Sequence, residues 1–359
     1  MLGAATLAAG CHSQSLDTQN GRCGPTPHLL ASAAVFPAPD AASERALLAG
    51  MAVGGSDLFF AVGATWADPR NLVAVPASAG ALMQVSTFGS TPKQLATGYD
   101  FGWTPLVMPT AVIVGVTSAS SIADPGILSV PRNGDPAVPL VALTYDSLLT
   151  LPVTDGTSVY FTANAGVESV PLAPGASPAV PTQLSSEYPI GLGVFGQRLL
   201  LLLSSGQVEG IPIGASDAGT GSRDAGTGEA SLGAGFADPV PDSLIPCGAD
   251  ACWMAGGAIE QMDPAEGEVT ALASLAGGPV AAPSTLLYDG TNFFVLGSSG
   301  SYAANAAIAR VPAKGGAPVV VATLPPSSRG LAVDDACVYF GTSTGIFSLL
   351  KDAEGVVVP

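Results

Sequence analysis

The stretch from Gly330 to Leu350 reads GLAVDDACVYFGTSTGIFSLL and contains most of the pattern that decides the fold. A small aliphatic segment leads through an Asp-Asp turn into an apolar-aromatic segment, and a Gly-containing loop then leads into a third, aliphatic segment. Asp and Gly suit the tight turns of antiparallel hairpins, and short aliphatic and aromatic runs are typical of strands. The stretch therefore predicts three antiparallel strands joined by short connections.

The same phrase recurs along the chain, with a fourth strand reading roughly Leu-Ala. Many third strands end in Val-Pro or Ile-Pro, because proline lacks the N–H that would continue a ladder. These prolines mark units of about 40 to 50 residues, and seven units can be counted. Four strands per unit, repeated seven times, predict an all-β fold over residues 48–358: a seven-bladed β-propeller with four antiparallel strands per blade. Tandem β-sandwiches are the structural alternative.

Two segments carry a family resemblance: Asp334–Phe340 (DDACVYF) and Ile308–Pro318 (IARVPAKGGAP). They resemble the repeats of poorly characterised exported bacterial lipoproteins that contain degenerate β-propeller units. The resemblance implies the propeller architecture and an exported chain, and it implies no particular activity.

The N-terminal sequence also indicates an exported chain. Residues 1–10 are apolar and small, and the run Leu7-Ala8-Ala9-Gly10-Cys11 resembles the lipobox that ends a bacterial lipoprotein signal peptide. The resemblance implies that Cys11 is lipidated and that residues 11–47 form a tether and N-terminal segment before the propeller. No Lys or Arg precedes the apolar run, which a start codon placed too far downstream would explain. The alternative is an ordinary Ala-rich N-terminus. We expect the protein to be located in the bacterial cell envelope, either in the periplasm or at the cell surface.

Four cysteines remain if Cys11 is acylated, and an even number in an exported chain suggests disulfides. Cys247 and Cys252 flank the turn-forming residues Gly-Ala-Asp-Ala, so we expect a bridge across one hairpin. Cys23 and Cys337 would then form the second pair by elimination.

Composition excludes several functions. The chain has 28 acidic and 11 basic side chains, a net charge of −17, which argues against a nucleic-acid partner. No apolar run approaches the roughly 20 residues of a membrane span, so we expect membrane contact through the lipid anchor only. Both histidines, His12 and His28, lie ahead of the repeats, which excludes a propeller-borne Ser-His-Asp triad. We predict no cofactor, although a divalent ion at the channel mouth stays open as an alternative.

Two further patterns have structural interpretations. The repeated Asp-Ala-Gly-Thr-Gly segment at 214–228 has nothing to bury, and we expect a disordered insertion. Acidic residues recur at the first hairpin turns, where Asp is good turn chemistry; calcium is less suitable because the D-x-D-x-D-G pattern is absent. These turn residues are Asp57, Asp155, Asp250, Asp289 and Asp335.

Loop length is the best pointer to a ligand face, because scaffolds place recognition on their longer loops. By the propeller resemblance, second-to-third and fourth-to-first strand connections open on one face, and the former are longest in units one, two and six. Ordinary loop packing is the alternative explanation for the side chains there. The candidate ligand rim consists of Trp66, Asp68, Arg70, Tyr99, Asp100, Trp103, Asp124 and Tyr302.

These observations favour a binding or interaction scaffold, a monomer anchored by lipid that recognises an unidentified protein or extracellular ligand. One alternative is a metal-dependent propeller hydrolase or lyase that uses the carboxylates of Asp68, Asp100 and Asp124. A structural envelope protein is the other.

Overall fold

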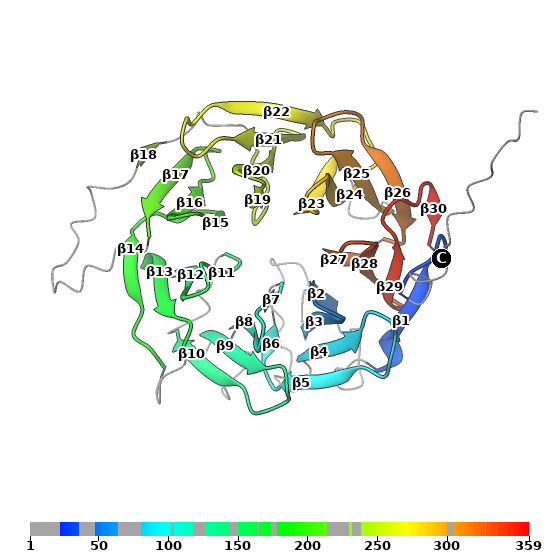
Figure 1. Cartoon of the computed structure of the whole chain (residues 1–359), viewed down its shortest axis with the longest axis horizontal. Coiled ribbons are helices and arrows are strands. Elements are labelled where there is room, and N and C mark those ends of the chain that lie inside the picture. Colours follow the sequence, from blue (N-terminus) through cyan, green and yellow to red (C-terminus); the bar gives the residue numbers. More distant parts are fainter. Residues whose placement is uncertain are drawn as a thin grey trace, which may run out of the picture.

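The recurring phrase folds into seven antiparallel sheets, and these stand as blades around a common axis (Figure 1). The seven-bladed propeller predicted from the sequence is therefore confirmed. In every blade the first strand of the unit lies nearest the axis and the later strands follow outward. The computed structural model describes residues 22–35, 47–63, 80–101, 104–117, 126–143, 150–163, 165–173, 178–213, 230–231, 238–299, 305–326 and 328–358.

Blades 1 to 4 follow one another along the chain. In blade 2 the inner strand is divided, because β6 and β7 both pair with β8. The strands, from the axis outward, are β2 (Leu47–Gly54), β3 (Asp57–Gly63), β4 (Ala81–Ser86) and β5 (Lys93–Thr97) in blade 1; β6 (Asp100–Phe101) with β7 (Leu106–Val107), β8 (Ala111–Thr117), β9 (Gly126–Pro131) and β10 (Val138–Ala142) in blade 2; β11 (Val153–Thr154), β12 (Ser158–Ala163), β13 (Gly166–Pro171) and β14 (Thr182–Ser185) in blade 3; and β15 (Gly191–Phe195), β16 (Arg198–Leu202), β17 (Val208–Pro212) and β18 (Ala230–Ser231) in blade 4.

Blades 5 to 7 complete the ring, and both ends of the described chain contribute to them. A short 3-10 helix, Ala33–Val35, follows the N-terminal strand. The strands are β19 (Ile245–Cys247), β20 (Asp250–Ala255), β21 (Ala258–Met262) and β22 (Val269–Ser274) in blade 5; β23 (Ala282–Tyr288), β24 (Asn292–Ser298), β25 (Ala306–Pro312), β26 (Val319–Leu324) and the parallel β30 (Val356–Val357) in blade 6; and β27 (Arg329–Val333), β28 (Cys337–Thr342), β29 (Gly345–Leu350) and β1 (His28–Ser32) in blade 7.

Ring closure corrects the predicted domain boundary. The segment 11–47 was expected to precede the propeller, but β1 pairs antiparallel with β29 and forms the outer strand of blade 7 (Figure 1). His28 therefore lies within the propeller, on an exposed position of that strand, and not ahead of it. The N-terminal strand supplies the fourth strand that the last unit of the sequence lacks.

Among the residues that the structure describes, the hydrophobic core forms seven separate clusters, each shared by two neighbouring blades. In the cluster between blades 7 and 1, Tyr339 and Ile346 pack with Phe60 and Met83, and all four are buried. The alternation of side chains along each strand turns one set of residues toward the preceding blade and the other toward the following one. This is why the aromatic strands have nearly continuous apolar runs: both faces of each sheet are covered.

Small residues on the innermost strands are required by crowding near the axis. A Cβ built on Gly50 would lie 2.5 Å from the Cα of Thr104 in blade 2. Gly330 has a φ of +69°, and a Cβ there would lie 2.5 Å from a side-chain methyl of Leu48 in blade 1. Glycine at these two positions therefore lets adjacent blades approach closely.

Candidate functional site

Most of the candidate ligand rim lies outside the described residues, namely Trp66, Asp68, Arg70, Trp103, Asp124 and Tyr302. Asp100 is described through its backbone alone, which pairs with Thr117. The half-buried Tyr99 packs edge-on against Phe101, with 6.0 Å between the ring centroids. Phe101 belongs to the core cluster between blades 1 and 2, and Tyr99 packs against that cluster. Cys11 and the insertion 214–228 also lie outside the described residues.

The carboxylates at the first hairpin turns hold those turns together. Asp155 Oδ1 accepts the backbone N–H groups of Thr157 and Ser158 at 2.7 and 2.8 Å, and its Oδ2 accepts the Tyr160 hydroxyl at 2.8 Å. Burial alone would raise the pKa of Asp155, but these donors outweigh burial and lower the pKa to about 2. The carboxylate is therefore ionised and engaged, as expected for a turn residue.

In blade 7 both Asp334 and Asp335 lie in the turn between β27 and β28, and Asp334 is the carboxylate that holds the turn as Asp155 does. Asp334 accepts the N–H groups of Ala336 and Cys337 at 2.9 and 2.8 Å and the Tyr339 hydroxyl at 2.7 Å. Arg22 forms an ion pair with the same carboxylate. Asp335 is instead largely exposed, with 77% of its side chain accessible.

Both disulfides predicted from the sequence are present. Cys23 is bonded to Cys337, which fastens the segment leading into β1 to β28. Cys247 is bonded to Cys252 across the turn between β19 and β20. Disulfides are characteristic of oxidising compartments, so the pairing supports a location outside the reducing cytosol.

Basic side chains join neighbouring blades. Arg132, which follows β9 in blade 2, reaches blade 1 and donates to Asp57 at 3.1 Å and to the Gly54 carbonyl at 2.9 Å. Its guanidinium also lies 4.9 Å from the centroid of the Phe59 ring. Arg132, one of the few basic side chains of this acidic protein, thus lies at a junction between two blades.

Blades 6 and 7 are joined in the same way. Lys351, which follows β29, donates to Asp289 of blade 6 at 2.7 Å. Burial would raise the pKa of Asp289, but Lys351 and the donors of its own turn lower the pKa to about 2. The carboxylate at this turn therefore serves both the hairpin and the junction.

One part-buried acidic residue links three blades. Asp242, just before β19 of blade 5, accepts the Leu151 N–H of blade 3 at 2.9 Å, and its own N–H donates to the Ile190 carbonyl at 2.8 Å. Its φ of 55° lies in the left-handed region. Burial raises the pKa of Asp242 to about 6, despite the opposing hydrogen bond from Leu151.

Among the described residues, no group of three or more His, Cys, Asp or Glu side chains is arranged to hold a metal ion. Within the same residues, no helix has the length and apolarity to cross a membrane.

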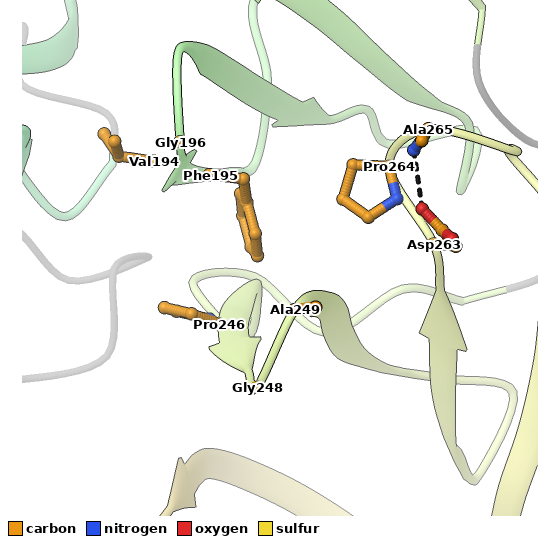
Figure 2. Close-up of a pocket in the computed structure, with 9 residues that line it drawn as sticks. All are labelled: Val194, Phe195, Gly196, Pro246, Gly248, Ala249, Asp263, Pro264 and Ala265. Carbon is orange, nitrogen blue, oxygen red and sulfur yellow. Dashed lines mark hydrogen bonds between the residues drawn. The ribbon is translucent and has the colours of Figure 1, made fainter.

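A concave surface does occur between blades 4 and 5, at the ends of their inner strands (Figure 2). It is an open cleft of about 360 Å³. One wall comes from the turn after β15, a second from the disulfide-closed turn between β19 and β20, and a third from the turn between β21 and β22. The lining residues are Val194, Phe195, Gly196, Pro246, Gly248, Ala249, Asp263, Pro264 and Ala265.

The walls of this cleft are held in place. The Cys247–Cys252 disulfide closes the hairpin whose tip is Gly248 and Ala249. Arg198 of blade 4 donates from Nη1 to the Pro264 carbonyl of blade 5 at 3.3 Å, which ties two walls together. Asp263 Oδ1 accepts the Ala265 N–H at 2.7 Å and caps the third turn (Figure 2). The shape therefore exists before any ligand arrives.

Sequence reasoning missed this cleft because it followed loop length. In an antiparallel blade, first-to-second and third-to-fourth connections lie at one end of the strands, and the longer connections of the predicted rim lie at the other. The cleft is built from the short connections. The available signal was the pair of short turns Cys-Gly-Ala-Asp-Ala-Cys at 247–252 and Asp-Pro-Ala-Glu-Gly-Glu at 263–268, both within one unit.

No protein-family model matches the chain, and no curated protein matches it. Solved structures of similar shape do exist, and three are informative. The extracellular domain of the two-component system protein BT3049 from B. thetaiotaomicron is 10% identical, with a TM-score of 0.55, and the match covers 91% of this chain and 41% of that one. PorZ, a bacterial surface component of the type-IX secretion system of Porphyromonas gingivalis, is 13% identical, with a TM-score of 0.53 and coverages of 88% and 38%. YCF48, solved bound to D1 peptide, is 12% identical, with a TM-score of 0.51 and coverages of 90% and 95%.

These likenesses concern the fold. The present chain spans less than half the length of the BT3049 and PorZ chains that it matches. At such low identity, a shared propeller carries no information about ligand or activity.

Proposed function

We propose that the chain is an exported, lipid-anchored propeller that binds a protein partner and carries out no catalysis. The observation that supports this most directly is the rigid cleft between blades 4 and 5, which presents apolar rings and small residues at the surface of an otherwise acidic molecule. Binding sites are commonly concave, mostly apolar and formed in advance.

The state of the charged side chains also supports binding over catalysis. Asp155, Asp289 and Asp334 are engaged by turn donors, and Arg132 and Lys351 hold blades together. Groups with these roles are held for stability, whereas catalytic acids and bases need freedom to gain and lose protons near neutral pH.

Export and anchoring rest on separate features. The two disulfides fit an oxidising compartment, and the Leu-Ala-Ala-Gly-Cys sequence ending at Cys11 supplies the lipid attachment. The structures of PorZ and the BT3049 domain, described as a surface component and as an extracellular domain, show that such propellers occur outside the cytoplasm in other bacteria.

The anchor is tested by expressing the full chain, preceded by a basic signal-peptide start, in a bacterium supplied with labelled palmitate. We expect label in the wild-type chain and none in Cys11→Ser, with the unlabelled variant in the soluble periplasmic fraction. Equal labelling of both chains would reject Cys11 as the attachment site.

Partner binding is tested by in vivo crosslinking of the anchored chain, followed by purification and mass spectrometry. We expect a small, reproducible set of envelope proteins. The cleft and the predicted rim are separated by comparing Ala249→Trp with the double variant Trp66→Ala/Trp103→Ala. If the set of crosslinked proteins is the same as that obtained with an unrelated lipoprotein, the binding proposal is rejected. Stoichiometric metal in the purified protein would favour the hydrolase alternative instead.

A further inference from the structure

We propose that the cleft between blades 4 and 5 binds an extended, proline-containing segment of a partner protein that carries Lys or Arg. The inference rests on the proposed binding function and names the chemistry of the partner. Three features lead to it: ring-bearing side chains in the lining, a proline at the centre of the edge strand β19, and carboxylates on the turns that border the cleft.

Three of the nine lining residues carry rings: Phe195, Pro246 and Pro264. The Phe195 ring points toward the turn between β19 and β20, with Pro264 on one side of the ring and Pro246 on the other (Figure 2). Grooves that receive polyproline II segments are lined by aromatic rings such as that of Phe195, and such segments lose little conformational entropy on binding. The cleft volume of about 360 Å³ lies at the lower end of the range for ligand pockets, so it fits a short segment rather than a folded domain.

Small residues keep the cleft open beside these rings. A Cβ built on Gly196 or on Gly248 would meet no atom within 4 Å. A partner backbone can therefore approach the two turns closely. Strand addition along β19 is a poor alternative, because Pro246 is the central residue of β19 and has no N–H to donate to a new strand.

Charge favours a cationic partner. The turns that border the cleft carry the carboxylates of Asp250, Asp263, Glu266 and Glu268 against one guanidinium, that of Arg198. Arg198 is already hydrogen bonded to the Pro264 carbonyl, and Asp250 accepts from Gln261. Asp263 lies in the lining itself, where its second carboxylate oxygen can meet a Lys or Arg side chain.

The test uses isothermal titration calorimetry with the full propeller and a synthetic peptide of sequence Pro-Pro-Lys-Pro-Pro-Lys-Pro-Pro, at low and at physiological salt. Two comparison peptides replace every lysine by glutamate or every proline by glycine. We expect saturable binding of the first peptide, weakened by salt, and at least about tenfold weaker binding of both comparison peptides.

Variants locate the binding. Ala249→Trp places a bulky ring at the exposed hairpin tip and should abolish binding without touching the core. Asp263→Asn keeps the oxygen that accepts the Ala265 N–H and should lower the affinity for the lysine peptide by about two- to fivefold. The matched control is Asp352→Asn, an exposed carboxylate on a blade 7 turn, which makes the same change of charge and should leave affinity unchanged.

The possible outcomes separate the two proposals. Absence of saturable peptide binding, equal affinity for the lysine and glutamate peptides, or unchanged affinity of Ala249→Trp would each overturn the cleft assignment. If the anchored chain still captures the same envelope proteins in those cases, partner binding holds and uses another surface. If the peptide binds as expected but crosslinking finds no partner, the cleft chemistry holds and the proposed function fails.

Discussion

Replacing Cys23 and Cys337 by serine should destabilise the propeller far more than the same replacement of Cys247 and Cys252. Both disulfides are buried, with residual exposures between 0% and 7% for the four cysteines, so the change at the sulfur atoms themselves is similar in the two variants. What differs is the length of chain that each bond closes.

The magnitude follows from loop closure in the unfolded state. The Cys23–Cys337 bond joins residues 314 positions apart, and the Cys247–Cys252 bond joins residues 5 apart. In the chain-entropy treatment of disulfides these loops correspond to about 6 and about 2 kcal/mol of stabilisation at 25 °C. The expected difference between the two double variants is therefore about 4 kcal/mol.

The larger effect also has a local component. The Cys23–Cys337 bond holds the segment that leads into β1, and β1 closes the ring. Without it, the segment is retained by the Arg22 ion pair and by hydrogen bonds such as that from the Leu350 N–H to the Gly24 carbonyl at 2.9 Å. We therefore expect faster hydrogen exchange of the amides of Leu30 and Ala31 in this variant, before global unfolding.

The assay is guanidinium chloride unfolding of both double variants and the oxidised wild type, followed by far-UV circular dichroism. Wild type in reducing agent serves as the control and should show the sum of the two losses. Equal shifts of the two midpoints, or a larger shift for Cys247→Ser/Cys252→Ser, would refute the ring-closure reasoning. Unchanged exchange at β1 would show that the remaining contacts hold the strand alone.

Three further perturbations test individual side chains. The pKa of Asp242 is about 6 in the folded protein and 3.8 for an unperturbed Asp, so this group stabilises the fold below about pH 4 and loses that contribution as the pH rises through 6. The Asp242→Asn variant should therefore show a smaller change of the urea unfolding midpoint between pH 4 and 7 than wild type. At pH 7.5 its free energy of unfolding should be higher than that of wild type by at most about 3 kcal/mol. Asp334→Ala should cost about 2 to 4 kcal/mol, whereas the exposed Asp335→Ala should cost less than about 1 kcal/mol, as measured by denaturant unfolding. Arg132→Gln should lower the melting temperature through loss of a blade junction worth about 1 to 2 kcal/mol, while the exposed Lys314→Gln should leave it unchanged.

Local pattern was enough to predict the blades. Each unit carries its own turn residues, aromatic strand and proline-ended strand, so strand order and the hairpin disulfide at Cys247 and Cys252 could be predicted from neighbouring residues. The N-terminal strand could not. His28–Ser32 is a short apolar run without a flanking repeat, and its partner β29 stands at the other end of the chain. The one sequence feature that predicts this N-terminal strand is that the last unit has only three strands of its own.

The turn pattern Asp334-Asp335 does not say which of the two carboxylates holds the blade 7 turn. Either residue is suitable for a turn by type, and the difference lies in geometry. The carboxylate two residues before Ala336 and three before Cys337 receives both backbone N–H groups and the tyrosine five residues later. Asp155 has the same spacing to Thr157, Ser158 and Tyr160, so comparing the two units would have selected Asp334.

The cleft was hidden for a physical reason that applies to propellers in general. Neighbouring blades must meet along their faces to bury the seven core clusters, so their short turns also approach one another, and any gap between them depends on the sizes of a few turn residues. Between blades 4 and 5 those residues include Gly196, Gly248 and Ala249, whose small size leaves the space open beside Phe195. A single bulky residue at one of these positions would close it. Recognition on such a scaffold therefore need not reside on long loops: short turns fixed by a disulfide or a cross-blade hydrogen bond can form a site with less conformational entropy to lose on binding.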